Sequence, residues 1–404
     1  MINVVGLGYI GLPTALMLAD SGVEVIGTDI NKEVIETLRN GKVTFEEEGL
    51  TSLFKSALEK GIQFSESYSE SDFYIISVPT PYNKVNKKID PSYVIGAIKQ
   101  VLKVCKKEAI IVIESTVSPG TIDQYVRPMI EESGYKVGID VHLAHAPERI
   151  LPGQMIQELR LNSRTIGADN LKIAQKVKDI YSSFCEGEIA TTEIRTAEMT
   201  KVVENTFRAI NIAFANELTK LAHQEKMDVY EIIKIANMHP RVNILNPGPG
   251  VGGHCIPVDP WFLVGDYPRL TNLISTALEI NESMPEHVLS RIHEIMEENG
   301  IKDKNKIGIY GLTYKSDVDD VRESPTLQMF EKMSEKFSTP FRVYDPMVTK
   351  KIVDSQVFDF DQFLEESEVI VIMQNHSHIK ENINKLQNKL LLDTQNFIEN
   401  SYKL

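Results

Sequence analysis

The first part of the chain, up to about residue 185, alternates short apolar runs with amphipathic stretches. The apolar runs are predicted strands, and they cover residues 2–5, 24–28, 73–77, 109–113 and 141–145. Stretches with helical spacing lie between them, for instance at residues 10–20, 32–39 and 93–104. Continuous apolar strands separated by helices are typical of a parallel sheet that helices cover on both faces. The pattern therefore predicts an α/β domain.

The middle of the chain has a different pattern. Neither Gly nor Pro occurs from Glu188 to His239, and the apolar residues recur at helical spacing. The spacing predicts a shorter helix at 229–236 and, before it, one long helix containing Val202, Ile210, Ala213, Phe214, Leu218 and Leu221. A helix of that length usually joins domains or forms a subunit interface. A loop rich in Gly and Pro, from Asn246 to Cys255, ends this helical region.

From about residue 304 the alternation resumes. Strands are predicted at residues 306–310, 341–344, 368–373 and 389–393, with helices such as 325–336 between them. The expected fold is therefore α/β, with two Rossmann-like, doubly wound domains joined by a central helical region. The expected boundaries are 1–187 for the first domain, 188–300 for the helical region and 301–404 for the last domain.

Composition narrows the classes of partner. A hydrophobic content of 42% and a charged content of 25% are those of a globular protein. The formal charge of −14 argues against nucleic acid or an anionic membrane as a partner. An anionic small molecule stays possible, since a few Arg and Lys side chains can build a positive pocket. No apolar run approaches the ~20 residues of a membrane-spanning helix. Three widely spaced cysteines and no visible leader predict a cytoplasmic protein.

The segment Gly6-Leu-Gly8-Tyr-Ile-Gly11 follows a predicted strand and opens a predicted helix. Gly6 permits a tight turn, Gly8 lets the backbone approach a pyrophosphate, and Gly11 lets the helix pack on the strand. The unpaired N–H groups of the helix N-terminus then face the phosphates. Asp29 ends the second strand, where a carboxylate accepts hydrogen bonds from ribose hydroxyls and repels a 2′-phosphate. The segment therefore predicts a site for NAD rather than NADP.

Cys255 lies in a glycine-bounded turn, Gly252-Gly-His-Cys-Ile-Pro-Val-Asp259. Cys105 and Cys185 lie in apolar periodic stretches and are interpreted as inert small hydrophobes. In a Gly-rich loop, backbone N–H groups can surround a thiolate sulfur and an attached oxyanion. The loop context leaves both a catalytic and a structural role open for Cys255.

Further polar segments have a similar character. The segments Glu114-Ser-Thr116-Val-Ser-Pro-Gly120 and Ala146-Pro-Glu148-Arg149-Ile-Leu-Pro-Gly153 each follow a strand end, where open α/β sheets bind ligands. Lys201 and Asn205 are spaced i, i+4 on one face of the long helix, with Arg208 one turn further on. Taken singly, each segment is explained more simply as solvated surface.

Taken together, these segments resemble the UDP-glucose/UDP-N-acetylmannosamine dehydrogenase family over essentially the entire chain. The matching pieces are the glycine fingerprint, Val78-Pro-Thr80-Pro, Glu114-Ser-Thr116, Pro147-Glu148-Arg149, Arg195-Thr-Ala-Glu-Met199, Lys201 with Asn205, Gly252-Gly-His-Cys255, Gly311-Leu-Thr-Tyr-Lys315 and Arg322-Glu-Ser-Pro325.

Within this family the details resemble the UDP-N-acetyl-D-mannosamine 6-dehydrogenase branch. The glucose branch usually carries Phe after Pro-Glu, and Lys before the Asp that follows the Cys. This chain has Arg149 and Val258 at those positions. UDP-N-acetylglucosamine remains an alternative substrate, since it differs only in the configuration at C2, and UDP-glucose is the weaker alternative.

The resemblance implies a double oxidation of the sugar's C6 alcohol to a carboxylate, with two NAD molecules reduced in turn. Cys255 would attack the intermediate aldehyde and give a thiohemiacetal, which a second hydride transfer converts to a thioester. Glu148 would act as the base for its hydrolysis, with Thr116 helping to hold the water. Lys201 would serve either as proton acceptor or as cationic stabiliser of the C6 oxygen, and Asn205 and Asp259 would complete the polar network.

The resemblance also implies roles position by position. The implied catalytic residues are Cys255, Lys201, Glu148, Thr116, Asn205 and Asp259. The residues implied around NAD are Gly6, Gly8, Tyr9, Ile10, Gly11, Asp29, Thr80, Thr116 and Arg322. The residues implied to contact substrate are Arg149, Ile150, Lys201, Asn205, Arg208, His239, Arg241, Gly250, Tyr314 and Lys315. No metal is implied. A homodimer through the long helix and a role in supplying polysaccharide precursors are expected from the family.

Two other readings of the chain remain open. A single-step β-hydroxyacid dehydrogenase shares the N-terminal domain and helical middle, but it has no use for Cys255 or for a C-terminal nucleotide-binding domain. An NAD-binding regulator without catalysis would not need the six residues implied in the chemistry. All six are present in this chain: Thr116, Glu148, Lys201, Asn205, Cys255 and Asp259.

Overall fold

The computed structural model describes residues 1–150, 153–333 and 341–404. The chain divides into two compact units, Met1–Glu204 and Asn205–Leu404, and each is described by itself below. The division falls within helix α8 (Ile194–Gln224), which is 31 residues long.

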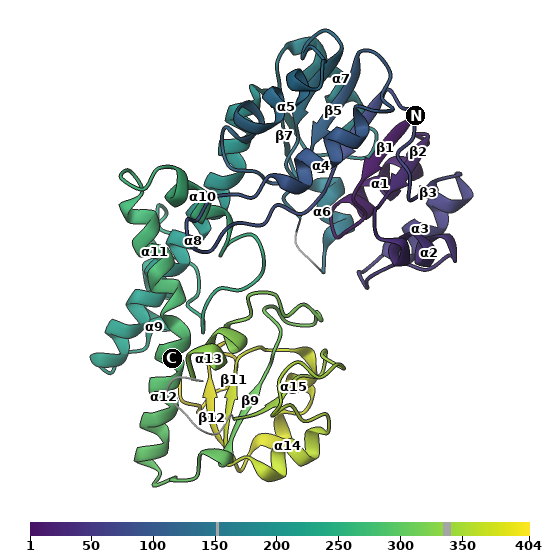
Figure 1. The fold of residues 1–404 in the computed structure, drawn as a ribbon. Coiled ribbons are helices and arrows are strands. Elements are labelled where there is room, and N and C mark those ends of the chain that lie inside the picture. Colours follow the sequence, from purple (N-terminus) through teal and green to yellow (C-terminus); the bar gives the residue numbers. More distant parts are fainter. Residues whose placement is uncertain (151–152, 334–340) are drawn as a thin grey trace. The chain divides into compact units, whose positions relative to one another are not determined.

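The first unit is built on an eight-stranded sheet in which β1 lies between β2 and β4 (Figure 1). Neighbouring strands are parallel except for β6 and β7, which are antiparallel. Across the sheet the strands are β3 (Gln63–Ser65), β2 (Val25–Thr28), β1 (Ile2–Val5), β4 (Phe73–Ile76), β5 (Ala109–Ile113), β6 (Val141–His145), β7 (Arg164–Ala168) and β8 (Ile189–Thr192).

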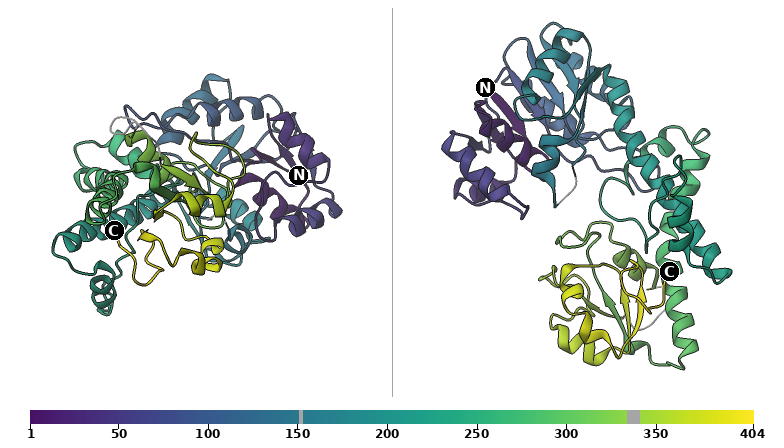
Figure 2. Two further views of the ribbon diagram at one scale, coloured as in Figure 1. Left: turned by 90° about the horizontal axis from the view of Figure 1, so that it is seen from below. Right: turned by 180° about the vertical axis from the view of Figure 1, so that it is seen from behind.

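Helices cover both faces of this sheet (Figures 1 and 2). Side chains alternate between the faces of a strand. On β4, Phe73 and Ile75 accordingly join the core cluster beneath α1, α3, α6 and α7, while Tyr74 and Ile76 do not. The helices of this unit are α1 (Gly11–Asp20), α2 (Lys32–Arg39), α3 (Leu50–Glu59), α4 (Ser92–Val101), α5 (Arg127–Glu132), α6 (Met155–Leu161) and α7 (Leu171–Tyr181), with a short π-helical turn at Ile122–Val126.

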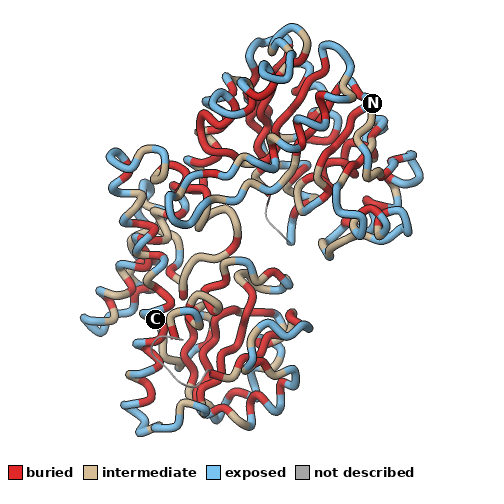
Figure 3. Tube along the Cα trace, viewed as in Figure 1, coloured by how far each residue is buried: buried red, intermediate tan, exposed pale blue. Residues whose placement is uncertain are grey.

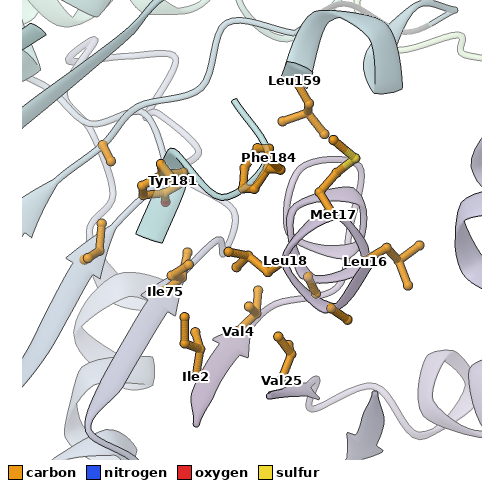
Figure 4. Close-up of a cluster of buried hydrophobic side chains, with 14 of the residues drawn as sticks. Ile2, Val4, Leu16, Met17, Leu18, Val25, Ile75, Leu159, Tyr181 and Phe184 are labelled. Atoms are coloured by element: carbon orange, nitrogen blue, oxygen red, sulfur yellow. The ribbon is translucent and has the colours of Figure 1, made fainter. Parts of the chain in front are cut away.

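The core of the first unit forms around helix α1, whose residues Gly11–Ala19 are all buried. Leu16 and Leu18 of α1 pack in the same cluster as Val4 of β1 and Ile75 of β4 (Figure 4). Burying one such side chain contributes roughly 1.5–3 kcal/mol. Because α1 is apolar on all sides, it is fixed firmly against the strand that precedes it.

The turn between β1 and α1 requires glycine. Gly6 has φ +90°, and a Cβ there would lie 2.3 Å from the carbonyl oxygen of Ser77. A Cβ on Gly11 would lie 1.9 Å from the carbonyl oxygen of Gly6. Backbone therefore packs on backbone at both positions, and no larger residue fits. Gly8 differs, because a Cβ there would meet no atom within 4 Å.

The second unit begins with helices and ends with a smaller sheet. After α8 come α9 (Val229–Ala236), α10 (Asp259–Asp266), α11 (Asn272–Glu282) and α12 (Met284–Glu298). A four-stranded parallel sheet follows in the order β10 (Arg342–Tyr344), β9 (Ile307–Tyr310), β11 (Val369–Ile372) and β12 (Leu390–Asp393). The residues of β9 and β11 are all buried (Figure 3).

Helices also cover both faces of the second sheet. One core cluster joins Ile307 and Ile309 of β9 to α12 and α13 (Pro325–Met333). The other joins Tyr310 to α14 (Phe360–Glu366) and α15 (Ser377–Glu381). Short turns at Lys304–Lys306 and Ile383–Leu386 complete the unit.

The structure confirms the predicted α/β architecture and the long helix. The helix predicted at 229–236 is α9, and the predicted strands agree with β1, β5 and β6 and differ by one residue at one or both ends elsewhere. Strand β8 (Ile189–Thr192) lies where the pattern from residue 188 on predicted helix, and it extends the first sheet. The three domain boundaries stay a prediction. Residues 334–336 of the helix predicted at 325–336 lie outside the described residues, as do Leu151 and Pro152 of the segment ending at Gly153.

The β1–α1 turn yields a paired stability test. Gly11→Ala forces Cβ against the Gly6 carbonyl, so we expect the free energy of unfolding to fall by about 3 kcal/mol or more. Gly8→Ala meets open space and should change it by less than about 0.5 kcal/mol. Urea unfolding followed by circular dichroism measures both. Equal stability of the two variants would contradict the close packing described here.

Candidate functional site

The β1–α1 turn of the first unit has the features of an anion-binding turn. Helix α1 begins at Gly11, and its N-cap residue Ile10 offers no side-chain hydrogen bond. Backbone N–H groups in the first turn of a helix have no partner within the helix, and together with the helix dipole they favour a phosphate. Gly8 is exposed, and no heavy atom lies near its missing side chain. The residues present therefore fit a dinucleotide pyrophosphate.

Asp29 lies just beyond β2 and is partly exposed. Its Oδ2 accepts a hydrogen bond from the backbone N–H of Leu7 at 2.8 Å, and its Oδ1 accepts one from Asn31 N–H at 2.8 Å. These bonds fix the carboxylate beside the glycine turn. Each carboxylate oxygen has a second lone pair, so hydroxyl groups of a ribose can still donate to it. Tyr9, in the same turn, stacks on Phe45 with ring centroids 4.4 Å apart.

A buried polar cluster lies at the end of β5. The Glu114 side chain accepts hydrogen bonds at Oε1 from the Tyr181 hydroxyl at 3.0 Å and the Thr14 hydroxyl at 3.3 Å. Its Oε2 accepts one from the Ser77 hydroxyl at 2.5 Å. Thr14 belongs to α1, Ser77 follows β4 and Tyr181 ends α7. One carboxyl group thus ties together three elements around the nucleotide turn.

Arg164 of β7 joins this cluster to the segment predicted to carry the base. Its guanidinium forms a buried ion pair with Glu148, and its Nη1 lies 3.6 Å from Oε1 of Glu114. It also lies over the Tyr181 ring, 4.5 Å from the centroid. Two buried carboxyl groups therefore share one cation. Burial raises the pKa of Glu114 to about 7, with Arg164 opposing the shift and Glu148 adding to it.

The predicted water-holding residue, Thr116, lies in a loop that Glu198 of α8 holds. The Glu198 carboxylate accepts hydrogen bonds from Gly120 N–H at 2.6 Å and Ile122 N–H at 3.0 Å. Burial raises the pKa of Glu198 to about 7. Lys201, also buried, follows Glu198 by about one turn of the helix. Glu198 lies in the motif Arg195-Thr-Ala-Glu-Met199 and had no predicted role; its spacing of three residues from Lys201 was the available signal.

Arg149 and Ile150 are engaged within the first unit. Arg149 donates from Nε to Oε2 of Glu204 at 2.8 Å, and its Nη1 and Nη2 reach the Ser163 carbonyl at 2.6 Å and the Thr165 hydroxyl at 2.8 Å. Ile150 is buried in the core of this unit. Their expected contact with a substrate stays a prediction.

Cys255 lies in the second unit, in the turn that leads into α10. Its carbonyl oxygen accepts hydrogen bonds from Val258 N–H at 3.1 Å and Asp259 N–H at 2.8 Å, and the thiol is free of any disulfide. Asp259 Oδ2 accepts a hydrogen bond from Asn205 Nδ2 at 2.7 Å, and both side chains are buried. The turn is therefore anchored to α8 through the two residues predicted to complete the polar network.

Asparagines of α8 hold the loop that precedes Cys255. Asn211 bonds the backbone of Asn243 and Leu245, at 2.8 and 2.9 Å, and Asn216 accepts from Gly248 N–H at 3.0 Å. The segment that contains the predicted substrate residues His239 and Arg241 is exposed, as is Arg208 of α8.

The loop after β9 carries three more predicted residues. Tyr314 donates its backbone N–H to the Asp320 carbonyl at 3.0 Å, and Arg322 donates from Nε to the Asp320 carboxylate at 2.9 Å. The carbonyl of Arg322 accepts a hydrogen bond from Gly253 N–H at 3.0 Å. This loop therefore meets the turn that carries Cys255.

The predicted site residues fall in both units. The first unit contains Gly6, Gly8, Tyr9, Ile10, Gly11, Asp29, Thr80, Thr116, Glu148, Arg149, Ile150 and Lys201, and the second contains Asn205, Arg208, His239, Arg241, Gly250, Cys255, Asp259, Tyr314, Lys315 and Arg322. Across the described residues, no cluster of three or more His, Cys, Asp and Glu side chains is placed to hold a metal ion. In the same part of the chain, every helix is too short or too polar to cross a bilayer.

Comparison with known proteins gives three consecutive family matches. Residues 1–185 match the NAD binding domain of the UDP-glucose/GDP-mannose dehydrogenase family, residues 195–283 its central domain, and residues 308–400 its UDP binding domain. The chain is 42% identical to the UDP-N-acetyl-D-mannosamine dehydrogenase of Methanococcus maripaludis, over 99% of this chain and 93% of that protein.

Solved structures give the same picture. The UDP-N-acetyl-mannosamine dehydrogenase of Staphylococcus aureus is similar with a TM-score of 0.88 and 41% identity, covering 99% of this chain and 96% of that one. The UDP-D-ManNAc dehydrogenase of Pyrococcus horikoshii is similar with a TM-score of 0.91 and 39% identity, again over 99% and 96%.

The buried cluster predicts a pH effect on stability. Because the folded-state pKa of Glu114 lies at about 7, above its ordinary 4.5, the folded protein binds this proton more tightly than the unfolded chain. The group therefore favours folding fully below about pH 4.5, and that contribution of about 3 kcal/mol is lost as the pH rises to about 7. In Glu114→Gln this titration is absent, so the variant should gain stability relative to wild type across that window.

Urea unfolding of both proteins at several pH values between 4.5 and 8 measures the difference. Glu59→Gln, at an exposed position that ends α3, is the matched control and should run parallel to wild type. A Glu114→Gln curve that also runs parallel to wild type would show that Glu114 titrates normally.

Proposed function

Because this chain belongs to the UDP-glucose/GDP-mannose dehydrogenase family, whose cofactor is NAD, we propose that it oxidises UDP-N-acetyl-D-mannosamine at C6 to UDP-N-acetyl-D-mannosaminuronate. The observation that carries this choice of sugar is the near full-length similarity to proteins named for that substrate. Arg149 and Val258, where the glucose branch usually has Phe and Lys, favour the same choice. UDP-N-acetylglucosamine and UDP-glucose are the alternatives.

NAD accepts a hydride in each of the two oxidations when it is bound. We assign the turn of Gly6, Gly8 and Gly11 to NAD, with Gly8 facing the pyrophosphate, and Asp29 to the adenosine ribose, with contacts from Tyr9, Ile10, Thr80, Thr116 and Arg322. The uncapped start of α1 and the open space at Gly8 support this assignment. Because Asp29 repels a 2′-phosphate, the site should discriminate against NADP.

In the first oxidation, Lys201 handles the charge on the C6 oxygen. The alcohol loses a hydride to NAD, and its proton passes to Lys201 where Lys201 is the acceptor, or to solvent where Lys201 is a cationic stabiliser; an aldehyde remains. Lys201 is buried, so an ammonium there acts on a developing oxyanion with little competition from water. Asn205 and Asp259, already joined by a hydrogen bond, order the polar groups around that oxygen.

In the second oxidation, Cys255 retains the aldehyde on the enzyme. Its thiolate sulfur bonds to C6, the carbonyl electron pair moves to oxygen, and protonation gives a thiohemiacetal. The C6 hydride passes to the second NAD and the hydroxyl proton to Lys201 or to solvent, which leaves a thioester. Because of the covalent bond, the aldehyde need not escape between the two oxidations.

Hydrolysis then frees the cysteine. Water, held by Thr116 and deprotonated by Glu148, adds to the thioester carbonyl, and the C–S bond breaks to give the carboxylate and the Cys255 thiolate. The ion pair with Arg164 and the bond from Arg149 N–H at 2.6 Å keep the Glu148 carboxylate in one orientation. The buried position of Glu148 limits bulk water around it.

The UDP-sugar is anionic, and the cations assigned to it suit an acidic protein. We assign Arg241 and Lys315 to the pyrophosphate, where charge-assisted hydrogen bonds are strong. The other proposed substrate contacts are Arg149, Ile150, Lys201, Asn205, Arg208, His239, Gly250 and Tyr314. The matched UDP binding domain over residues 308–400 supports the placement of Tyr314 and Lys315.

We also propose that the chain works as a homodimer through α8, and that it does so in the cytoplasm. Val203, Phe207, Phe214 and Leu221 are 47–66% exposed. At 100° per residue these positions fall within about 40° of one another around the helix axis. A stripe of large apolar side chains in solvent on one long helix is the kind of surface that a second copy covers. The free cysteines suit a reducing compartment.

The stoichiometry of NADH tests the four-electron chemistry. Purified protein with NAD should form two NADH per molecule of UDP-N-acetylmannosamine consumed, with much slower turnover of UDP-N-acetylglucosamine and UDP-glucose. Cys255→Ser should fail to complete the second oxidation, because a hydroxyl is a far weaker nucleophile than a thiolate. Absorbance at the NADH band and chromatography of the sugar nucleotides give the ratio.

The same assay separates the alternatives. Faster oxidation of UDP-glucose or UDP-N-acetylglucosamine would replace the proposed sugar but keep the chemistry. One NADH per sugar in the wild type would falsify the four-electron mechanism. No NADH from any UDP-hexose would favour the binding protein without catalysis.

A charge in the stripe on α8 tests the dimer. Phe214→Glu should shift the protein from twice the mass of the chain to the mass of one chain in sedimentation equilibrium, because a buried unpaired carboxylate opposes association. Leu171→Glu, at a residue that is 82% exposed on α7, is the control and should leave the mass unchanged. A wild-type protein that sediments as one chain would contradict the proposal.

A further inference from the structure

Two loops of the second unit meet at the point where strand order reverses. In the sheet, β9 lies between β10 and β11, so the chain runs to one side of β9 and then returns to the other. In open α/β sheets ligands bind beyond the carboxyl ends of the strands at such a point. The loop after β9 contains Tyr314 and Lys315, and the loop after β11 contains His376, a residue with no role so far.

The loop after β9 is held by side chains from its two neighbouring strands. Asp345, just beyond β10, accepts hydrogen bonds from Leu312 N–H at 2.5 Å and Thr313 N–H at 3.1 Å. His376, beyond β11, accepts one at Nδ1 from Asp317 N–H at 2.9 Å. The Asp317 carboxylate in turn accepts from the N–H and the hydroxyl of Ser377, both at 2.8 Å. Both ends of the loop are therefore fixed.

These contacts determine which nitrogen of the neutral His376 ring carries the proton. Since Nδ1 accepts a hydrogen bond from the Asp317 N–H, the neutral ring carries its proton on Nε2. Nε2 lies 3.4 Å from the Thr313 hydroxyl and 3.4 Å from Oδ2 of Asp345. The Thr313 hydroxyl donates its own proton to the Lys315 carbonyl at 2.8 Å, so it is free to accept from Nε2. The imidazole is fully buried and faces partners through both nitrogens.

The backbone conformation of Asp317 indicates that these contacts stabilise the loop. Asp317 has φ +58°, a left-handed conformation that is unfavourable for a residue with a side chain. The bonds of Asp317 to His376 and Ser377 compensate for that cost. Without His376, the Asp317 N–H would lose its acceptor, and the loop could relax toward an ordinary conformation.

The position of this loop also sets the position of the cysteine turn. A Cβ on Gly252 would lie 2.5 Å from Cβ of Tyr314, and one on Gly253 would lie 2.9 Å from the Tyr314 ring. The backbone of the cysteine turn thus packs directly on the Tyr314 side chain, two residues before Cys255. A displacement of Tyr314 therefore moves the surface on which the cysteine turn rests.

We infer that His376 is a positioning residue that fixes the loop Leu312–Asp317, so that Tyr314 and Lys315 are preformed for the uridine diphosphate group and Tyr314 supports the Cys255 turn. This inference rests on the proposed assignment of Tyr314 and Lys315 to the substrate. It adds a residue that touches neither the substrate nor the cofactor in the proposed mechanism.

Three substitutions distinguish positioning from general stability. His376→Asn keeps an acceptor near the place of Nδ1, whereas His376→Gln keeps only a group near the place of Nε2, and His376→Ala keeps neither. His378→Ala is the matched control, because His378 lies two residues further on, in α15, and contacts the Tyr310 hydroxyl at 3.1 Å. Circular dichroism and thermal unfolding are recorded for each variant.

The readouts are the Kd of UDP by calorimetry, the KM and kcat for UDP-N-acetylmannosamine, and the rate of Cys255 alkylation by iodoacetamide. Losing one buried hydrogen bond typically costs enough to weaken binding about tenfold. We expect His376→Gln and His376→Ala to raise the Kd and KM about tenfold and to change the alkylation rate. His376→Asn and His378→Ala should stay within about twofold of wild type.

Each outcome decides between the alternatives. If wild type does not bind UDP, the proposed function fails, and the alkylation rates alone then judge the coupling of His376 to the cysteine turn. If wild type binds UDP, and Gln and Asn at position 376 bind it equally well, the positioning role is overturned. A fall in kcat alone, with KM, Kd and alkylation unchanged, also overturns it. If His376→Ala does not fold, the Asn and Gln pair still gives the answer.

Discussion

Close packing against the backbone of glycines in loops is the constraint on which the rest of this structure depends. In the first unit the Gly6 carbonyl occupies the space that a side chain at Gly11 would need. In the second unit Tyr314 occupies the space beside Gly252 and Gly253. Glycine at these positions lets a loop approach its neighbour to a distance that no other residue permits. The result is a pair of closely packed turns, one proposed to bind the dinucleotide and one proposed to carry the nucleophile.

Buried ionisable side chains lie near both turns, and their surroundings set the pKa values of their carboxyl groups. Glu114 and Glu148 share Arg164 in the first unit, and Asp345 faces His376 in the second. Burial alone would raise the pKa of Asp345, yet its hydrogen bonds from His376, Leu312 and Met347 hold that pKa below its usual value. For Glu114, burial and the neighbouring Glu148 outweigh Arg164 and the hydrogen bonds from Ser77 and Tyr181, so its pKa rises to about 7. The pKa values of the two buried carboxyl groups therefore shift in opposite directions.

The local sequence pattern predicted the architecture because apolar residues form continuous runs in buried strands and recur at helical spacing in amphipathic helices. The helix at 229–236 was located correctly because Asp228 caps it and its apolar residues recur at helical spacing. Strands β3, β7 and β8 were missed because none gives a continuous apolar run: β3 is the tripeptide Gln63–Ser65, β7 begins with Arg164, and β8 consists largely of Ala and Thr. Their strand character comes from pairing within the sheet, which is a tertiary effect.

Those parts of the candidate site that lie in short sequence motifs could be predicted. Those parts that form from residues far apart in the chain could not. Glycine spacing and the context of Cys255 are visible in short segments. The partnership of Thr14 with Glu114 joins residues 100 positions apart, and the contact of His376 with Asp317 joins residues 59 apart. Arg164 and His376 lie in none of the motifs quoted above, and Glu198 lies in one that gave it no role. The importance of these residues follows from the partners that the fold gives them.

The central claim is that Cys255 carries the sugar as a thioester, and trapping that species tests it most directly. In Glu148→Gln, hydrolysis should slow while both oxidations continue, so the acyl-enzyme should accumulate during turnover of UDP-N-acetylmannosamine with NAD. Mass spectrometry of the acid-quenched, digested protein should then find the peptide containing Cys255 heavier by the mass of the sugar nucleotide acyl group. Uronate formation in the same samples, with Cys255 unmodified at every time point, would contradict the account.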